Sequence, residues 1–219
     1  NPENPHEVDA VPIVRPLTLP LIRPLGVADA GGASPAPATY ATWNSADKDA
    51  SVVLSLADLR AAKPSGGGWG NVRATIGKAS GKWRWRKLDG TGAHLIVGVG
   101  TIDAPLGGAG NSNYLGADAN GWGFYVGDGN LYSVHNGSVV QITSLAQAAE
   151  VELRLNLDAN TLSLVRGVDT LHTFDVSSRG SATLYPMQSL FSAGPAATAN
   201  FGPDNLGTPV AGYNDGVFE

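Results

Sequence analysis

The amino-acid sequence predicts an all-β fold: an antiparallel β-sandwich preceded by an extended, Pro-rich N-terminal arm. Three observations support this prediction. Residues 150–165 have the alternation of a hairpin, short apolar segments follow one another between Gly, Pro, Asn and Asp turns, and no long segment has helical periodicity. Many short strands at this spacing are typical of a sandwich, and a βαβ layout is excluded because it needs long helices.

The hairpin at residues 150–165 is the most regular pattern in the chain. Apolar side chains alternate with polar ones along its first strand, at Val151, Leu153, Leu155 and Leu157. Neighbouring side chains of a strand point to opposite faces, so this strand has one apolar and one polar face. The turn residues Asp158-Ala159-Asn160 follow, and the alternation resumes over 161–166. The sequence therefore indicates an antiparallel hairpin with one buried face.

The predicted strands run in order from Tyr40 to about Gly202. They are 40–43, 51–56, 72–76, 82–88, 93–100, 121–126, 130–135, 138–142, 150–157, 161–166, 171–176, 184–190 and 196–201. Asn136-Gly137 strongly favours a two-residue hairpin turn, and Gly127-Asp128-Gly129 indicates another turn. The only segments with plausible helical character are short: 56–62 and 144–149. We predict one sandwich over 40–202 and an irregular C-terminal tail over 203–219.

The composition excludes several classes of function. The 219 residues suffice for one large β domain with a sizeable core. The lack of cysteine excludes disulfides, thiolate catalysis and cysteine-ligated metals. The formal net charge is −5 and only 15% of residues are charged, so we expect no nucleic-acid partner, which would need clustered Lys and Arg. No apolar run approaches the ~20 residues of a membrane helix, and we expect no membrane insertion.

Residues 1–39 are predicted as an extended docking arm and linker. Prolines recur every four residues, at Pro12, Pro16, Pro20 and Pro24. This spacing excludes a helix and favours an extended path. A flexible lead segment is one interpretation, but the residues between the prolines are too apolar for a solvated linker. We therefore expect the arm to lie along a partner's surface, with these candidate docking residues: Arg15, Leu17, Leu19, Leu21 and Arg23.

Several sequence landmarks occur in a fixed order over about residues 40–202. They are Thr75-Ile76-Gly77 with Gly81-Lys82-Trp83-Arg84-Trp85, Ile96-Val97-Gly98-Val99-Gly100, Tyr114-Leu115-Gly116 with Gly121-Trp122-Gly123-Phe124-Tyr125, the 150–165 hairpin, Leu184-Tyr185-Pro186-Met187 and Ala199-Asn200-Phe201-Gly202. In this order they resemble a SPRY domain, a concanavalin-like β-sandwich. The departures, Ala149-Glu150 and Arg166-Gly167, fall at expected loops. The resemblance implies binding through loops at one edge of the sandwich, here 63–71, 103–113 and 127–130.

A narrower resemblance comes from the proline spacing of the arm and from Thr42-Trp43-Asn44-Ser45-Ala46-Asp47-Lys48. Both resemble SPRY-type proteins of tailed bacteriophages, which occur among tail, fibre and other virion components. The resemblance implies a location in the virion after assembly in the host cytoplasm. It also implies other virion subunits as partners of the arm and a host-surface glycan or protein as a partner of the loops. We further expect a homo-oligomer.

Patterns for catalysis and metal binding are incomplete. Glu150 and Glu152 share a strand face, but the third acid of a Glu-x-Asp-x-x-Glu glycosidase pattern is missing, and a solvated face explains the pair better. The histidines have no metal-ligand spacing, which favours structural roles for all four: His6, His94, His135 and His172. Asp/Asn-rich turns suggest calcium only weakly, because these residues are ordinary turn formers. We expect no catalytic residue, no metal and no cofactor.

Three aromatic residues are our candidates for ligand binding. Trp69 lies in Gly66-Gly67-Gly68-Trp69-Gly70, an expected loop with no strand to bury it. Tyr125 and Tyr132 point away from the apolar residues of their strands. Exposed aromatic side chains suit sugar stacking or protein contact. Binding and packing both remain open as the role of these three residues.

Two functional hypotheses follow from the sequence. The first is a non-enzymatic structural protein of a tailed-phage virion, in the tail, a fibre or a decoration, which displays the sandwich and is anchored by its arm. The alternative is a carbohydrate-binding module of a bacterial surface or secreted protein. A glycosidase is disfavoured by the missing carboxylate arrangement.

Overall fold

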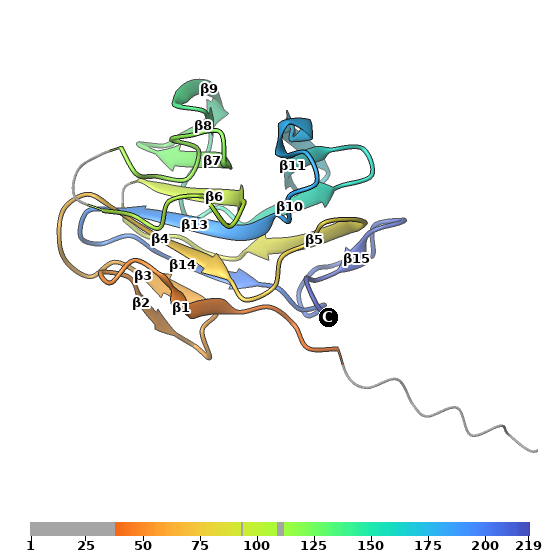
Figure 1. Cartoon of the computed structure of the whole chain (residues 1–219), viewed down its shortest axis with the longest axis horizontal. Coiled ribbons are helices and arrows are strands. Elements are labelled where there is room, and N and C mark those ends of the chain that lie inside the picture. The colour runs from red at the N-terminus through yellow and green to blue at the C-terminus, as the bar shows by residue number, and fades with distance from the viewer. Residues whose placement is uncertain (1–37, 93, 109–111) are drawn as a thin grey trace, which may run out of the picture. The chain divides into compact units, whose positions relative to one another are not determined.

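The computed structural model describes residues 38–92, 94–108 and 112–219, and in this part of the chain two β-sheets pack into a sandwich (Figure 1). The predicted all-β architecture is confirmed, and a short 3-10 turn, η1 (Ser177–Arg179), interrupts it. Among the described residues, no helix has the length and apolar character to cross a membrane. Most of the predicted arm, residues 1–37, lies outside the described residues, and so do its docking residues Arg15, Leu17, Leu19, Leu21 and Arg23.

The first sheet has seven strands that are neighbours in space but not in sequence. Their order is β1 (Trp43–Lys48), β4 (Trp69–Ala74), β13 (Tyr185–Phe191), β6 (Leu95–Gly100), β7 (Gly121–Gly127), β8 (Asn130–His135) and β9 (Ser138–Ser144). Each neighbouring pair is antiparallel. The strand β13 comes late in the chain but lies between β4 and β6. The pairing of β4 with the β6–β9 part of the sheet therefore depends on a strand that is distant in sequence.

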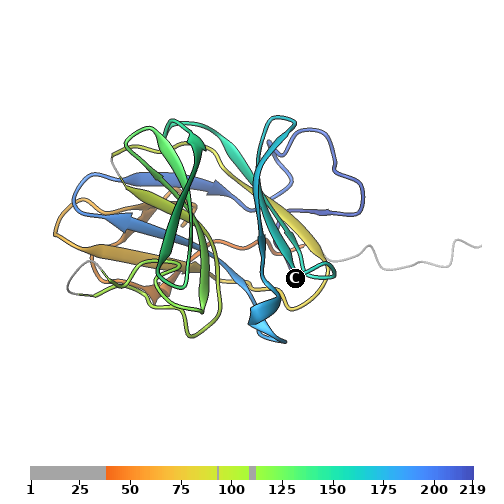
Figure 2. The same cartoon turned by 90° about the horizontal axis from the view of Figure 1, so that it is seen from above.

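The second sheet packs against the first and includes the hairpin that the sequence marks most clearly. Its order is β12 (Asp169–Asp175), β11 (Thr161–Arg166), β10 (Val151–Asn156), β5 (Lys82–Lys87), β14 (Ala196–Asn200), β3 (Arg60–Ala62) and β2 (Val53–Ser55), with β15 (Asn214–Asp215) paired in parallel to β5. The strands β9 and β12 are edge strands of the two sheets, and they contact each other. The β8–β9 hairpin (green) and the β11–β12 hairpin (teal to blue) therefore lie beside each other (Figure 2).

The core lies between the sheets and is built from the alternating apolar faces. In the predicted hairpin, Leu153 pairs with Leu164 and Leu155 with Leu162, and all four side chains are buried. From the first sheet, Trp122 and Phe124 are fully buried in the same cluster. Full burial of a large apolar side chain contributes about 1.5–3 kcal/mol, so these residues supply much of the stability of the sandwich.

The turns between strands also follow the sequence pattern. Asn136 and Gly137 have φ angles of 49° and 73°, the left-handed pair of a type I′ turn between β8 and β9. Asp128 and Gly129, with φ of 51° and 76°, join β7 to β8 in the same way. Both predicted hairpin turns are therefore confirmed.

The two predicted helical segments are wrong. Leu56, Ala57 and Asp58 all have left-handed φ angles, between 53° and 61°, and the chain then enters β3. Residues 145–149 form a turn in which the buried Leu145 donates from its backbone N–H to the carbonyl of Gly129 at 2.9 Å. In both segments, strand pairing and burial override the local preference of Leu, Ala and Gln for a helix.

The segment after Gly202, which the sequence leaves without regular structure, packs onto the sandwich. Asn214 and Asp215 form β15 against β5, and Val217 is buried in the main core. The ring of Phe218 lies 5.4 Å from that of Tyr40 and 5.4 Å from that of Trp83. The last residues of the chain therefore complete the fold at the point where the described part begins.

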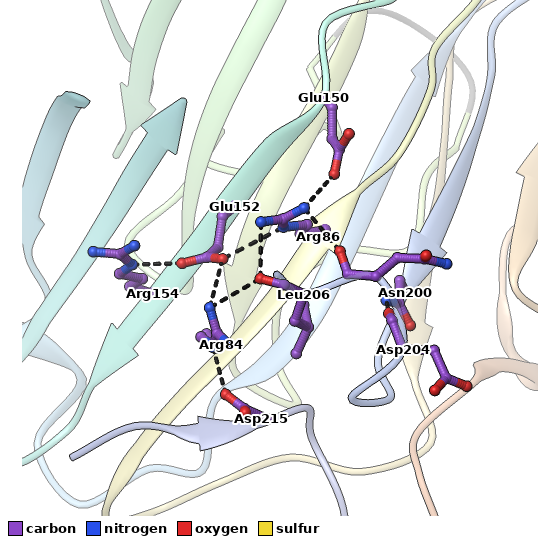
Figure 3. A network of polar contacts seen from close by, with 10 residues as sticks. Arg84, Arg86, Glu150, Glu152, Arg154, Asn200, Asp204, Leu206 and Asp215 are labelled. Carbon is purple, nitrogen blue, oxygen red and sulfur yellow. Dashed lines mark hydrogen bonds and ion pairs between the residues drawn. The ribbon is translucent and has the colours of Figure 1, made fainter. Parts of the chain in front are cut away.

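A buried ion-pair network fastens this segment to the outer face of the second sheet (Figure 3). Glu152, at 5% exposure, accepts hydrogen bonds from Arg84 Nη1 at 3.1 Å and Arg154 Nε at 2.5 Å. Arg84 also bonds Asp215 Oδ1 through Nε at 2.6 Å, and Arg84 and Arg86 both donate to the carbonyl oxygen of Leu206. The expected solvated strand face is thus wrong for Glu152, because the C-terminal segment covers it.

We expect Glu152→Gln to lower the free energy of unfolding by about 3–5 kcal/mol, because it removes the buried charge that Arg84 and Arg154 share and leaves Asp215 as the only acid paired with Arg84. Glu150→Gln is the matched control: Glu150 pairs with Arg86 at 2.6 Å, but its side chain is 48% exposed, so its loss should cost at most ~1 kcal/mol. Urea titration of both variants measures the difference. Equal losses in the two variants would contradict the central role of Glu152.

A pH effect is expected at Asp89. Burial alone would raise the pKa of this carboxyl, but hydrogen bonds from the backbone N–H and hydroxyl of Thr198 and the nearby Arg60 guanidinium outweigh burial and hold the pKa below its ordinary value of 3.8. The stability that Asp89 contributes is therefore present above pH 3.8 and is lost as the pH falls through the lowered folded-state pKa. We expect Asp89→Asn to be less stable than the natural chain at neutral pH and the gap to close in strong acid, as measured by denaturant unfolding at several pH values.

Candidate functional site

The outer face of the seven-stranded sheet is crossed by the loop that joins β6 to β7. Gly107 in this loop forms an isolated bridge with Gly70 at the start of β4. The side chain of Asn71, fully buried, donates to the carbonyl oxygens of Pro105 at 2.7 Å and Asn113 at 3.0 Å. A single amide side chain thus holds two parts of the loop against the sheet.

Beneath this loop lies a second, smaller apolar cluster, separate from the main core. Ile96 of β6, Met187 of β13 and Leu115 of the loop are all buried in it. Gly123 of β7 allows this close approach, because a Cβ there would lie 3.0 Å from the carbonyl oxygen of Leu115 and 2.4 Å from Ile96. The sheet therefore packs apolar side chains on both of its faces. The cluster on the outer face also contacts the aromatic residues Trp69, Tyr114 and Tyr125.

Four half-buried aromatic side chains gather beside this cluster, and we call them the aromatic patch: Trp69, Tyr114, Tyr125 and Tyr132. The ring of Trp69 lies 5.4 Å from that of Tyr114 and 6.1 Å, edge-on, from that of Tyr125. Tyr125 and Tyr132 are cross-strand partners of β7 and β8, and their rings stack at 5.4 Å. These separations are within the range of favourable aromatic pairs, so the patch is a packed unit.

His94 and Phe191 anchor the patch at the end of the sheet. The hydroxyl of Tyr125 is hydrogen-bonded to Nδ1 of His94, and the ring of Phe191 lies 5.0 Å from Trp69 and 5.6 Å from His94. Burial raises the pKa of the Tyr125 hydroxyl, and Asp128 and Tyr132 raise it further. Tyr125 therefore remains protonated at neutral pH and keeps a hydroxyl for hydrogen bonding.

A shallow cavity of about 220 Å³ opens within the patch. Its walls are mostly apolar and are formed by Trp69, Ile96, Tyr114, Tyr125, Val134 and Val139. Val139 belongs to the edge strand β9 and is 50% exposed. Apolar and aromatic walls with a few hydroxyl groups are typical of surfaces that bind a small group of a ligand or a side chain of a partner.

The three candidate residues from the sequence lie together in this patch. Tyr125 and Tyr132 lie on the face turned away from the main core, as their alternation predicts. Trp69 was expected in a loop, but it is the first residue of β4 and packs against neighbouring rings. Tyr114 was not among the candidates. Its only signal was its place in the Tyr-Leu-Gly landmark, which says nothing of the Trp69 ring beside it.

The loops expected to bind partners are partly brought together. The bridge between Gly70 and Gly107 and the bonds of Asn71 place 63–71 beside 103–113, of which 109–111 lie outside the described residues. The 127–130 turn lies at the same end of the sheet. Leu95 pairs with Val126 on one side and with Leu190 on the other, and the next residue, Phe191, pairs with Trp69. The patch lies between these loops.

The other polar candidates have structural surroundings. His135 bonds the carbonyl oxygen of Gly121 through Nδ1 at 2.7 Å and stacks on Trp122 at 4.8 Å, and His172 packs edge-on against Phe174. Burial lowers the pKa of His172. In the part of the chain that the structure describes, no three His, Asp or Glu side chains gather as a metal site requires.

Comparisons with known proteins address the fold. No protein-family model matches the chain. Among solved structures, the TRIM65 PSpry domain matches with a TM-score of 0.63 and 16% identity, over 74% of this chain and 89% of that domain. The SPRY domain of human HERC1 matches with a TM-score of 0.56 and 21% identity, over 72% of this chain and 96% of that domain.

Stonustoxin also matches, with a TM-score of 0.60 and 17% identity, over 73% of this chain but only 28% of the toxin chain. At these identities the similarity concerns the fold alone. Together with the two packed antiparallel sheets, these matches show that the described part of the chain has a SPRY-like β-sandwich fold.

Proposed function

We propose that this chain is a non-enzymatic interaction protein whose sandwich binds a partner through the aromatic patch. The observation that carries the proposal is the grouping of four half-buried aromatic rings on the outer face of the first sheet, three of which, Trp69, Tyr114 and Tyr125, line a cavity. Aromatic side chains dominate the binding energy of many interfaces, since they offer a large apolar area with little loss of conformational entropy. The SPRY-like fold supports an interaction role.

The state of the carboxylates supports a non-enzymatic role. A glycosidase needs one carboxylic acid that gives a proton and a second carboxylate that acts on the other side of the bond. Glu152 is buried and bonded to Arg84 and Arg154, and Glu150 is paired with Arg86. Both carboxylates are therefore engaged in ion pairs with arginines, and two of these arginines, Arg84 and Arg86, also bind the C-terminal segment.

In its fuller form, the proposal is a structural protein of a tailed-phage virion: a tail, fibre or decoration component. The sandwich would be displayed outward, and residues 1–39 would dock on other virion subunits. The support is the sequence resemblance of the arm and of 42–48 to phage SPRY-type proteins, together with the apolar, Pro-periodic composition of the arm. The same proposal places the protein in the virion, after assembly in the host cytoplasm, as a homo-oligomer.

The second candidate is a carbohydrate-binding module of a bacterial surface or secreted protein. The stacked Tyr125 and Tyr132 rings favour it, because planar aromatic surfaces flanked by hydroxyl groups suit the apolar face of a sugar ring. A host-surface glycan would be a ligand under both candidates, so glycan binding alone does not separate them. The genes next to this one would: tail and capsid genes favour the virion, and glycosidase genes favour the module.

The binding site is tested with Tyr132→Ala, which removes one ring of the stacked Tyr125–Tyr132 pair but leaves Trp69 in place. We expect binding to host cells or to an array of bacterial glycans to weaken roughly tenfold or more. Tyr213→Ala is the matched control, since Tyr213 is also half-buried but belongs to the C-terminal segment. Unchanged binding in Tyr132→Ala, or equal loss in both variants, would remove the patch from consideration.

The arm is tested by deleting residues 1–30. If the arm docks on a partner, the shortened chain should remain folded, with an unchanged β-type circular dichroism spectrum, but should no longer join phage particles in a complementation experiment. The full-length chain is the control for incorporation. Incorporation of the shortened chain into particles at the normal level would exclude the docking role.

A further inference from the structure

The strand β9 (Ser138–Ser144) forms an open edge of the first sheet (Figure 1). It is the last strand in the order of that sheet, and β12 of the other sheet contacts it without pairing with it. All residues of β9 except Ile142 are exposed, including Val139 at 50% and Val140 at 57%. The backbone along this edge is therefore accessible to a further strand.

The other edge strands of the two described sheets have features that discourage such pairing. The strand β1 carries Asp47 and Lys48 and has an irregular register with β4, and β2 has only three residues. The strand β12 begins with Asp169 and ends with Asp175. Charges, short length and bulges are the usual protections of an edge. The seven residues of β9 include no charge and no proline, and a bulge interrupts its register only at Ile142.

The hairpin turn determines which backbone groups of β9 point outward. In a hairpin with a two-residue turn, the residues on either side of the turn form a hydrogen-bonded pair, here His135 and Ser138. The direction alternates along the strand, so Val140 also faces β8, whereas the N–H and C=O groups of Val139 and Gln141 point away from it. These outward groups would bind an added strand.

The Pro-rich arm has a sequence pattern that suits this edge. Neighbouring residues of a strand direct their backbone groups to opposite sides, so prolines at even positions would all fall on one side: 12, 16, 20 and 24. The odd residues from Ile13 to Leu25 all keep their N–H groups on the other side. Proline is tolerated in an edge strand where its nitrogen faces solvent. This segment can therefore pair along one side only.

The middle of the segment also matches β9 in length and charge. Residues 16–22, between Arg15 and Arg23, are uncharged and span as many residues as β9. Successive side chains alternate between faces, so Val139 and Val140 lie on opposite faces of the sheet. The leucines of the arm would therefore cover an exposed valine on whichever face they lie.

The length of the chain favours the arm of a second copy over the protein's own arm. The described chain enters beside β1, the edge strand opposite β9, and the width of the sheet between them is about 29 Å. A linker of the length of residues 26–37 has a root-mean-square span of about 20 Å, and it would have to pass around the sandwich. A neighbouring copy imposes no such path.

We propose that residues 12–25 of one copy add to β9 of a second copy as a new edge strand. This inference rests on the docking arm of the proposed function and names the surface that receives it. Two copies that exchange arms form a closed pair. The prolines on the outer side of the added strand then prevent a further strand from joining.

The arm is tested in the full chain by two neighbouring proline substitutions, each of which removes a branched apolar side chain. Leu21→Pro removes an N–H group from the side that faces β9, whereas Ile22→Pro changes the side that already carries the prolines. We expect the natural chain and Ile22→Pro to sediment as oligomers in analytical ultracentrifugation. Leu21→Pro should raise the dissociation constant roughly tenfold or more.

The edge is tested at Gln141, which is exposed. Gln141→Pro removes an outward N–H group but leaves the pairing of β9 with β8, and Gln141→Thr is the matched control, because it keeps that group. Only the proline variant should dissociate. In the natural chain, the amides of Val139 and Gln141 should be protected from hydrogen exchange, and Leu21→Pro should remove this protection. The exchange measurement decides the matter if Gln141→Pro proves poorly folded.

Each contrary result has its own meaning. A monomeric full chain overturns this inference, while loss of particle incorporation on deletion of residues 1–30 would still support docking on another virion subunit. Dissociation in Gln141→Pro but not in Leu21→Pro overturns the inference in favour of β9 pairing with its own copy. The reverse result would assign the arm to another surface. Equal loss in Leu21→Pro and Ile22→Pro would exclude a one-sided strand pairing.

Discussion

The structure depends on one carboxylate that is buried among arginines. Glu152 of β10 bonds Arg84 and Arg154 and approaches Arg86 at 3.4 Å, and the two arginines of β5 in turn hold the carbonyl oxygen of Leu206. A buried charge is tolerated only when it is paired and hydrogen-bonded. The network therefore requires β5, β10 and the C-terminal segment to be in place together. It makes the last residues of the chain part of the sandwich.

The two faces of the sandwich are used differently. The first sheet has an outer apolar layer, in which Asn71 fixes the crossing loop and Gly123 admits Leu115. On this layer the aromatic patch is held by mutual packing rather than by burial alone. The second sheet has an outer polar layer, made of arginines and acids under the C-terminal segment. The two outer faces of the sandwich therefore differ in chemistry: one is apolar and aromatic, and the other is charged.

The sequence was sufficient to predict the sandwich fold, but it predicted only some of the residues in the aromatic patch and in the ion-pair network. The alternation at 150–157 and the Asn136-Gly137 turn are local signals, and local signals suffice for strands and hairpins. Trp69 and Glu152 were misplaced because their surroundings come from distant parts of the chain. The first packs on Tyr114 and Tyr125, and the second lies under residues near 206 and 215. A single sequence carries no direct signal for such contacts.

The described chain enters and leaves the sandwich at one point. Tyr40 and Phe218 form a bridge, and the backbone N–H of Glu219 donates to the carbonyl oxygen of Thr39 at 3.1 Å. Any segment joined at either side of the domain therefore departs from the same corner. As a result, the sandwich could be inserted into a surface loop of another protein without separating the ends of that loop.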